Sequence, residues 1–192
     1  VEFGQIQLPL SGAGVLPTVT DTVTMGNNSV ISGFAITGVT GAGVTARNIN
    51  NAVIKDNTIS SINTAGVLLE NTTGLLTLSN NTVIGNGVSS LVGININDLA
   101  ISNSPITSIN SETDGIYFNG VRGNVAITYS PIMITKPQCN GIFAENITGN
   151  LSFTASNSSK ISNTGNYGVK LSNSTGTITL SNFEITDTNN SG

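Results

Sequence analysis

The stretch from Gly66 to Val83, GVLLENTTGLLTLSNNTV, decides the fold because it recurs along the chain. Related stretches begin at Gly141, which opens GIFAENITGNLSFTASNS, and at Gly168, which opens GVKLSNSTGTITLSNFEI. Similarity between segments at a period of roughly 20 to 50 residues is typical of solenoids, in which each repeat buries its apolar side against its neighbours. The recurrence therefore predicts stacked repeats around one continuous core.

Each repeat begins with a glycine and an apolar, any, apolar triplet. The leading glycines are Gly43, Gly66, Gly93, Gly115, Gly141 and Gly168, which lie 23, 27, 22, 26 and 27 residues apart. An upstream copy is present too, since NNSVISGFAITG from Asn27 matches NNAVIKDNTISS from Asn50. We interpret residues 20–192 as a single domain of about seven coils, an excerpt of a longer chain. Residues 1–19 are interpreted as an entry or capping segment, or a partial coil.

The triplets alternate between apolar and variable positions, as a strand with one buried face requires. Two further apolar pairs follow in each repeat, such as Leu76 with Leu78 and Ile132 with Ile134. Three short strands and three turns in 22 to 27 residues predict an all-β fold, a parallel β-helix with three short parallel sheets. Leucine-rich repeats have a similar period but need a helical half, and the sequence has no 3.6-residue pattern.

Asparagine recurs five residues after the leading glycine. Asn and Asp tolerate the left-handed backbone conformation and hydrogen-bond nearby backbone groups. We therefore predict a structural ladder of stacked side chains at this turn, formed by Asn48, Asn71, Asp98, Asn146 and Asn173.

The composition excludes several classes of function. Six Lys and Arg residues stand singly in a chain of net charge −4, so no basic stripe is available to bind nucleic acid. No apolar run reaches the roughly 18 residues needed to cross a bilayer, so we expect no membrane insertion by this segment. The chain has no histidine and one cysteine, Cys139, so we predict no metal site, no cofactor and no His-dependent catalysis.

The motifs NNSVISGFAITG, GVLLENTTGLLTLSNNTV and GVKLSNSTGTITLSNFEI resemble the right-handed parallel β-helix repeats of the pectin-lyase-like superfamily. The resemblance extends over nearly the whole chain from about Thr20. Within that superfamily, the low charge and the Asn, Ser and Thr bias look most like the passenger regions of bacterial autotransporters and other surface adhesins. The resemblance implies a right-handed coil and an extracellular or bacterial cell-surface location.

Four residues on the outer side of the glycine-led strands form a candidate ligand-binding face. Tyr117 and Phe143 occupy equivalent positions in adjacent coils, so we expect them to lie about 5 Å apart, with Lys170 next and Glu145 beside them. Neighbouring exposed aromatics offer rigid apolar area for a sugar ring or a partner protein. The alternative is that Tyr117 and Phe143 pack under a loop or against a neighbouring domain.

The acidic residues do not predict a catalytic pair. Glu70 and Glu145 share a register but lie three coils apart, about 14 Å by strand spacing. Glycosidase carboxylates are separated by about 5 to 9.5 Å. Asp114 is interpreted as a turn residue, and no residue is assigned a catalytic role.

These observations favour a non-enzymatic segment of a bacterial surface-exposed or secreted protein, either an adhesin passenger or a rigid stalk. Its expected partner is a host-surface glycan or protein, and its oligomeric state is left open. The alternative is a carbohydrate-binding or carbohydrate-active module of the pectin-lyase type, a polysaccharide lyase or hydrolase, or a tailspike-like protein. A third hypothesis is a spacer without a ligand.

Overall fold

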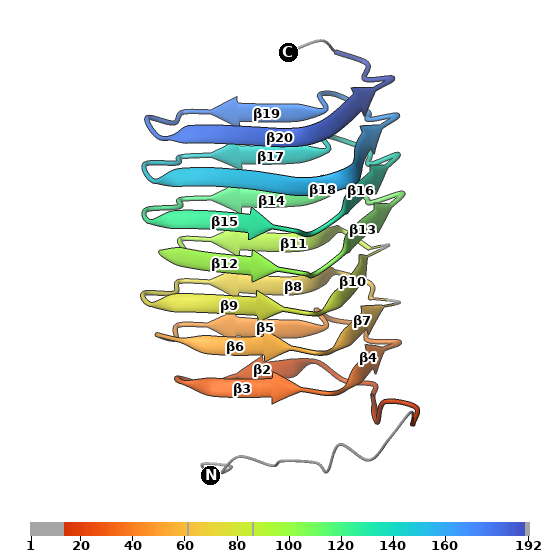
Figure 1. Ribbon diagram of the computed structural model, residues 1–192, viewed down its shortest axis with the longest axis vertical. Helices are drawn as coiled ribbons and strands as arrows, with labels where there is room; N and C mark the ends of the chain where they lie inside the picture. Colours follow the sequence, from red (N-terminus) through yellow and green to blue (C-terminus); the bar gives the residue numbers. More distant parts are fainter. Residues whose placement is uncertain (1–13, 61, 86, 191–192) are drawn as a thin grey trace.

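The chain forms a solenoid of strands. The computed structural model describes residues 14–60, 62–85 and 87–190, so most of the predicted entry segment, residues 1–13, lies outside the described residues. All the elements within these ranges are strands, β1 to β20, and every strand pair is parallel. In Figure 1 the front strands run left to right and those behind run right to left as the chain rises, which is a right-handed coil. The prediction of an all-β parallel β-helix of about seven coils is confirmed.

One face of the solenoid is a sheet of seven strands that we call the glycine-led sheet. Its strands are β2 (Val23–Met25), β5 (Val44–Arg47), β8 (Ala65–Glu70), β11 (Ser89–Ile94), β14 (Ile116–Asn119), β17 (Ile142–Glu145) and β19 (Val169–Ser172). They stack in chain order, so each strand pairs with the equivalent strand of the next coil.

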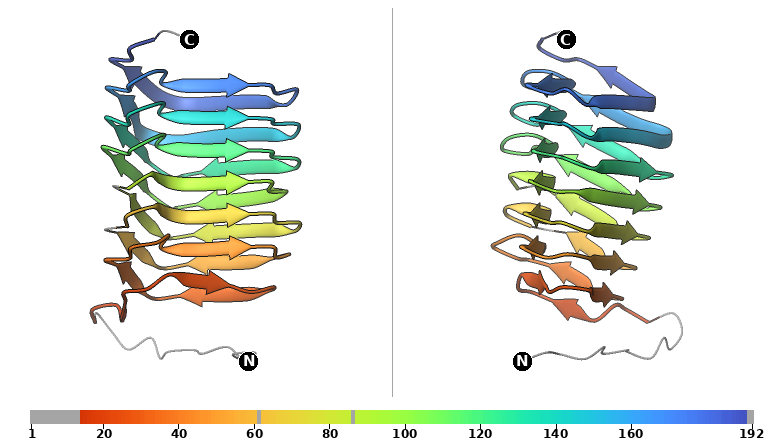
Figure 2. Two further views of the ribbon diagram at one scale, coloured as in Figure 1. Left: turned by 180° about the vertical axis from the view of Figure 1, so that it is seen from behind. Right: turned by 90° about the vertical axis from the view of Figure 1, so that its left-hand side faces the viewer.

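The remaining thirteen strands form the other two faces. The second face contains β3 (Ser29–Ser32), β6 (Ala52–Lys55), β9 (Leu75–Ser79), β12 (Asp98–Ser102) and β15 (Asn124–Thr128). The third contains β1 (Thr18–Val19), β4 (Ala35–Thr37), β7 (Thr58–Ser60), β10 (Thr82–Gly85), β13 (Ile106–Ile109) and β16 (Ile132–Thr135). Two long strands, β18 (Asn150–Ser162) and β20 (Thr177–Thr186), turn the corner from the second face into the third (Figure 2). The three predicted sheets are therefore present as three faces, and two of them join because β18 pairs with both β15 and β16.

The core runs along the whole solenoid axis. Inward-facing Val, Ile, Leu and Phe side chains form one buried cluster that extends from Met25 to Ile161. Along the third position of the glycine-led strands, small and large residues alternate: Ala46, Leu69, Gly93, Phe118 and Ala144. A Cβ at Gly93 would lie 2.7 Å from Cδ1 of Phe118, so the largest side chain of this row is accommodated by the residue that has none. This complementarity keeps the coils at strand spacing without voids.

The structure corrects the register of one coil. Gly93 was expected to lead its repeat, but Leu91 pairs with Val67 and with Ile116, which places Ser90 at the leading position. Ser90 fits there because Gly85 faces it: a Cβ at Gly85 would lie 2.5 Å from Oγ of Ser90.

The corrected register gives the coils regular lengths. The register partners Val44, Val67, Leu91, Ile116, Ile142 and Val169 are separated by 23, 24, 25, 26 and 27 residues. From Val44 on, each coil is thus one residue longer than the coil before it, and the apparent irregularity in this part of the sequence came from aligning on Gly93.

The same correction changes the asparagine ladder. The amide of Asn71 donates to Oδ1 of Asn48 at 3.2 Å, and the amide of Asn95 donates to Oδ1 of Asn71 at 3.1 Å. Asn95, with φ 51°, therefore takes the place that was expected for Asp98. Asp98 instead opens β12, where its Oδ1 accepts the backbone N–H of Asn124 at 2.8 Å.

Farther along the chain the ladder position is occupied by different residue types. Gly120 stands at this position with φ 73°, and Asn146 and Asn173 follow with φ 53° and 46°. The amide of Asn146 donates to Oδ1 of Asn119, the residue before Gly120, at 2.9 Å. The shared feature of the turn is its left-handed backbone, which Asn and Gly both tolerate.

A second ladder, which the sequence analysis did not predict, is buried at the corner between the second and third faces. Oδ1 of Asn81 accepts the backbone N–H and the amide of Asn57, both at 3.1 Å, and the amide of Asn81 donates to the carbonyl of Ile54 at 2.7 Å. Ser104 and Ser130 continue the row with hydroxyl oxygens that accept the next backbone N–H groups at 3.1 and 3.0 Å. These side chains satisfy backbone groups that the corner removes from the sheet.

Candidate ligand-binding face

The outer side of the glycine-led sheet changes character along its length. Its central outward row consists of Thr45, Leu68, Val92, Tyr117, Phe143 and Lys170. The first half of this row is small or aliphatic. The second half carries aromatic and charged side chains, so the candidate site lies on β14, β17 and β19.

Tyr117 and Phe143 form the centre of the site. They are register partners on β14 and β17, and their ring centroids lie 5.6 Å apart with a tilt of 37°. Both side chains are partly exposed on the outer side of the sheet. Their separation agrees with the spacing expected from adjacent coils, and it lies within the range of favourable aromatic pairs.

Lys170 lies on the next strand, β19, as the register partner of Phe143. Its Nζ is 5.1 Å from the ring centroid of Phe143 and 5.7 Å from that of Tyr167. Both distances are within the range of cation–π attraction. The ammonium is therefore held over two rings rather than extended away from the protein.

Glu145 is anchored by neighbouring side chains. The Tyr117 hydroxyl donates to Oε1 of Glu145 at 2.5 Å, and the amide of Asn119 donates to the same oxygen at 3.1 Å. The Asn119 amide also donates to the Tyr117 hydroxyl at 3.0 Å. This network fixes the Tyr117 ring and the Glu145 carboxylate in one orientation.

Asp114 belongs to the same face, although the sequence analysis treated it only as a turn residue. Its side chain is 8% exposed, and its Oδ1 accepts the backbone N–H and the amide of Asn140 at 2.9 and 2.8 Å. Oδ1 of Asn140 in turn accepts the backbone N–H of Tyr167 at 3.3 Å. A Cβ at Gly115 would contact Cγ2 of Ile134 in the core, so Gly115 and Ile116 both face inward. Simple alternation counted back from the triplet therefore does not place Asp114 on this face.

Burial and the local charges shift two pKa values in the site. Desolvation raises the pKa of Asp114 above its usual value, and this effect outweighs the hydrogen bonds from Asn140 and the attraction of Lys170. Desolvation also raises the pKa of Tyr117, and the hydrogen bond to Glu145 raises it further. Tyr117 is therefore a neutral hydrogen-bond donor at neutral pH.

We call the set Asp114, Tyr117, Phe143, Glu145, Tyr167 and Lys170 the aromatic face. The structure brings together all four residues that the sequence predicted for a ligand-binding surface and adds Asp114 and Tyr167. Of the predicted ladder residues, Asn48, Asn71, Asp98 and Asn146 accept or donate hydrogen bonds within the scaffold, and Asn173 shares the left-handed turn.

The other half of the glycine-led sheet forms a contrasting surface. Ala42, Ala65 and Val92 make a small buried apolar cluster on its outer side, with Leu68, Ile94 and Tyr117 packed against it, so Tyr117 joins the two halves of the sheet. At its edge the Nε of Arg47 lies 3.0 Å from Oε2 of Glu70. Arg47 and Glu70 are register partners on β5 and β8, and surface ion pairs of this kind contribute at most about 1 kcal/mol.

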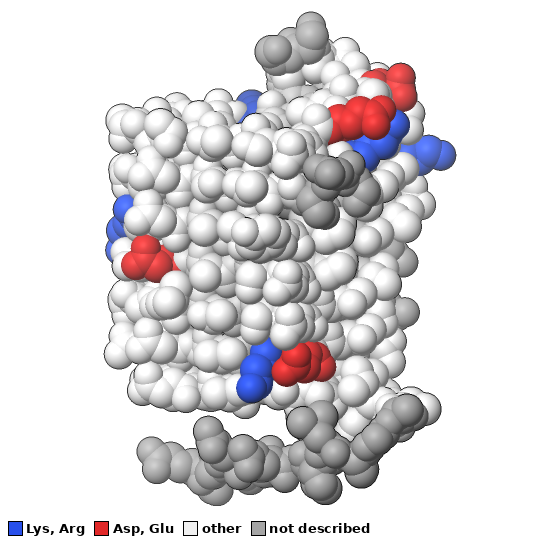
Figure 3. Space-filling view, in the orientation of Figure 1, with Lys and Arg blue, Asp and Glu red and all other residues white. Residues whose placement is uncertain are grey.

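The second face of the solenoid offers no comparable cluster among its described residues. Figure 3 shows that charged side chains are sparse on it. Its outward positions hold small residues such as Thr77, Ala100, Ala126 and Ser152.

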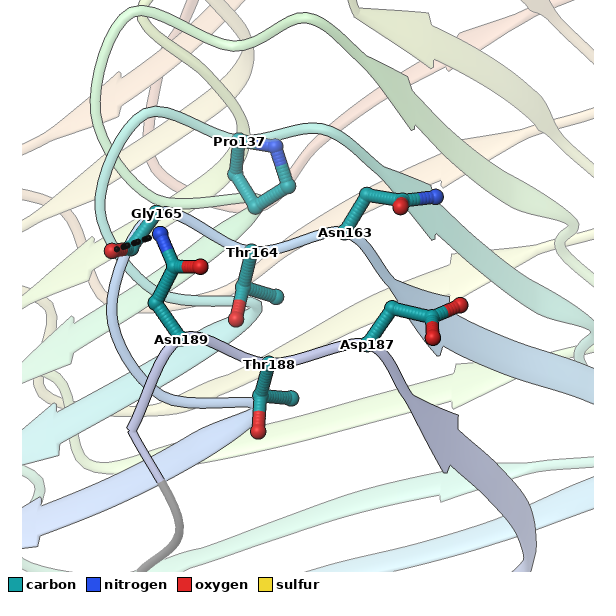
Figure 4. A pocket seen from close by; sticks show the side chains of 7 residues that line it. All are labelled: Pro137, Asn163, Thr164, Gly165, Asp187, Thr188 and Asn189. Carbon is teal, nitrogen blue, oxygen red and sulfur yellow. Dashed lines mark hydrogen bonds between the residues drawn. The ribbon is translucent and has the colours of Figure 1, made fainter.

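A polar pocket of about 410 Å³ lies elsewhere, at the C-terminal end of the solenoid. It is lined by Pro137, Asn163, Thr164, Gly165, Asp187, Thr188 and Asn189 (Figure 4). The amide of Asn189 donates to the carbonyl of Gly165 at 3.0 Å across it. Asp187 is its one ionisable residue, so the pocket lacks the convergent charged and aromatic groups found on the aromatic face.

Over residues 14–60, 62–85 and 87–190, no three His, Cys, Asp or Glu side chains are grouped closely enough to hold a metal ion. The same ranges contain no helix with the length and apolar character needed to cross a bilayer.

Comparison with known proteins finds no protein-family model, no curated protein and no solved structure that matches this chain. The function must therefore be argued from the aromatic face and the scaffold that carries it.

Proposed function

We propose that this chain is a non-enzymatic segment of a bacterial surface-exposed or secreted protein, an adhesin passenger or rigid stalk that binds an extracellular ligand through the aromatic face. The observation that carries the proposal is the Tyr117–Phe143 pair, which stands on the outer side of a sheet whose core is complete without it. Large aromatic side chains placed outside the core are a common feature of recognition surfaces.

Three properties of the scaffold support a role at the cell surface. Parallel coils stacked over a continuous apolar core give a long rigid body without disulfide bonds, and the chain has a single cysteine. The low charge and the repeat motifs resemble those of the pectin-lyase-like superfamily and, within it, of autotransporter passengers. We extend that resemblance to this chain as part of the proposal.

A second candidate is a carbohydrate-active module of the pectin-lyase type. It is favoured by one observation, the presence of two carboxylates, Asp114 and Glu145, beside Tyr117. Asp114 has a raised pKa, and the charge of Glu145 contributes to raising it. A carboxyl group with a raised pKa beside a second, ionised carboxylate is an arrangement used for general acid catalysis.

The experiment that tests the proposal compares the wild-type chain with a Tyr117→Ala/Phe143→Ala variant. Both are incubated with a panel of immobilised polysaccharides and matrix proteins, and bound protein and released products are measured together. We expect the wild type to bind at least one surface, the double variant to bind it at least 10-fold more weakly, and no product to appear.

The matched control is Leu68→Ala, which removes an apolar side chain from the same outward row two coils away. It should bind like the wild type, and the unfolding transitions of all the proteins show whether the variants remain folded. Equal binding by the double variant would contradict the proposed face. Product release that Glu145→Gln abolishes would establish the enzymatic candidate instead.

A further inference from the structure

We infer that the aromatic face is selective for neutral glycans over acidic and cationic ones. This inference rests on the proposed function and specifies the chemical class of its ligand. It depends on the arrangement of charge around Tyr117 and Phe143 and on which carboxylate oxygens are already occupied.

The carboxylates make the face unfavourable for acidic polymers. The face contains two acidic residues, Asp114 and Glu145, and one basic residue, Lys170. The Lys170 ammonium is engaged with the rings of Phe143 and Tyr167. A polymer of uronic acids would bring further carboxylates next to these two, and like charges at an interface oppose association.

Binding of a cationic ligand is disfavoured for a different reason. Aromatic rings beside carboxylates can form a site for an ammonium group. Here the protein's own ammonium already occupies this position, because Nζ of Lys170 is 5.1 Å from the Phe143 centroid. An incoming cation would have to displace Lys170 or approach its like charge, so a cationic ligand is disfavoured at this position.

The free carboxylate oxygens are suited to hydroxyl groups. The donors from described residues all reach Oδ1 of Asp114 and Oε1 of Glu145. Oδ2 of Asp114 and Oε2 of Glu145 receive none of these hydrogen bonds. Glu145 is partly exposed, whereas Asp114 is nearly buried. An ionised carboxylate only accepts hydrogen bonds, and each of its oxygens has two acceptor sites. Glu145 is partly exposed and held in place by Tyr117 and Asn119, so it presents a fixed acceptor to a ligand that is rich in hydroxyl donors.

The rings supply the apolar half of the site. A pyranose has an apolar face that carries C–H groups and a rim of hydroxyls, so it can lie on Tyr117, beside Phe143, while its rim reaches the Glu145 carboxylate. The two rings lie 5.6 Å apart along the solenoid axis, so the face can contact consecutive units of a chain that runs along this axis. Apolar contact together with a few fixed polar groups is the usual composition of small-ligand sites.

The test uses two polymers that differ only in charge: polygalacturonic acid and the neutral galactan made from it by reducing its carboxyl groups. We expect retention of the wild-type chain by the neutral polymer and at least 10-fold weaker retention by the acidic one at 0.15 M salt. Tighter retention by the acidic polymer would overturn the inference while leaving the proposed function intact, provided that the double variant loses it. Binding to neither polymer overturns the inference, and binding to no surface of the wider panel also overturns the proposed function.

A pair of isosteric variants assigns the selectivity to Glu145. Glu145→Gln keeps the size of the side chain but removes its charge, so it should lower retention by the neutral polymer and raise the ratio of acidic to neutral retention several-fold. Glu70→Gln is the matched control, because Glu70 lies in the same outward row on β8 and outside the aromatic face. Equal shifts in the two variants would show a general effect of net charge and would contradict a selective site.

Discussion

The two sides of the glycine-led sheet share one backbone but differ in what they require of the sequence. Phe118 points inward and is fully buried, whereas its neighbour Tyr117 points outward and is partly exposed. Inward positions must fit the coils above and below, as Gly93 and Phe118 do. Outward positions range from Thr45 to Phe143 along a single row without any change in strand pairing. Stability is therefore set by the inner side, while the outer side is free to carry recognition.

Separate truncation of the two adjacent aromatic side chains tests most directly whether inward residues contribute more to stability than outward ones. Phe118→Ala should lower the free energy of unfolding by about 4 kcal/mol, because the ring is buried against Phe153 at a centroid distance of 6.4 Å and leaves a cavity. Tyr117→Ala should lower it by about 1 kcal/mol, since it loses one hydrogen bond and surface contact. Urea-induced unfolding followed by circular dichroism measures both. Equal losses would mean that the outer row also supports the fold.

The ladders extend the comparison from apolar to polar side chains. Asn81→Ala should destabilise the chain by about 3 kcal/mol, because it leaves the carbonyl of Ile54 and the backbone N–H of Asn57 buried without partners. Asn71→Gly removes amide hydrogen bonds that are exposed, and glycine tolerates the φ of 52° at this position. We expect it to cost about 1 kcal/mol or less. Urea-induced unfolding measures the loss of stability in both variants. A larger loss for Asn71→Gly than for Asn81→Ala would contradict the conclusion that the buried ladder contributes more to stability than the exposed one.

The sequence predicted the fold because inward positions repeat their chemistry in every coil. Val, Ile and Leu recur at strand spacing, and Asn or Gly recurs at the left-handed turn. The predicted register was wrong in the coil where Ser90 stands at the leading position. Gly93, three residues later, also precedes an apolar, any, apolar triplet and was therefore mistaken for the leading glycine. Gly85, five residues before Ser90, leaves the space that the Ser90 side chain fills, and an alignment on leading glycines alone does not take this pair into account.

The candidate site was predicted only in part. Tyr117, Phe143, Glu145 and Lys170 follow from strand alternation and coil spacing. Asp114 and Tyr167 precede leading glycines, where the chain enters the strand and simple alternation does not apply. The hydrogen bonds from Asn140 to Asp114 join residues 26 positions apart, and they became visible only with the coils stacked.

The smallest expected effect on stability concerns Asp114, which lies on the outer side of the sheet yet is nearly buried. Burial raises its pKa in the folded chain above the value of about 3.9 expected when unfolded. The folded state therefore binds this proton more tightly, and the stabilisation is complete below the unfolded pKa and is lost as pH rises through the folded pKa. Asp114→Asn removes this titration and keeps an oxygen that can accept from Asn140.

We therefore expect the difference in unfolding free energy, wild type minus Asp114→Asn, to become more favourable to the wild type as pH falls from 7 toward 4. The groups that act on this carboxyl are Asn140, Lys170, Glu145 and Tyr117, and the variant retains all four. Asp21→Asn, at an exposed position, controls for the loss of one negative charge. A difference that instead grows with rising pH would show that attraction to Lys170 outweighs desolvation. Asp114 would then stabilise the folded chain through its charged form, as an outward surface carboxylate does, and not through its buried neutral form.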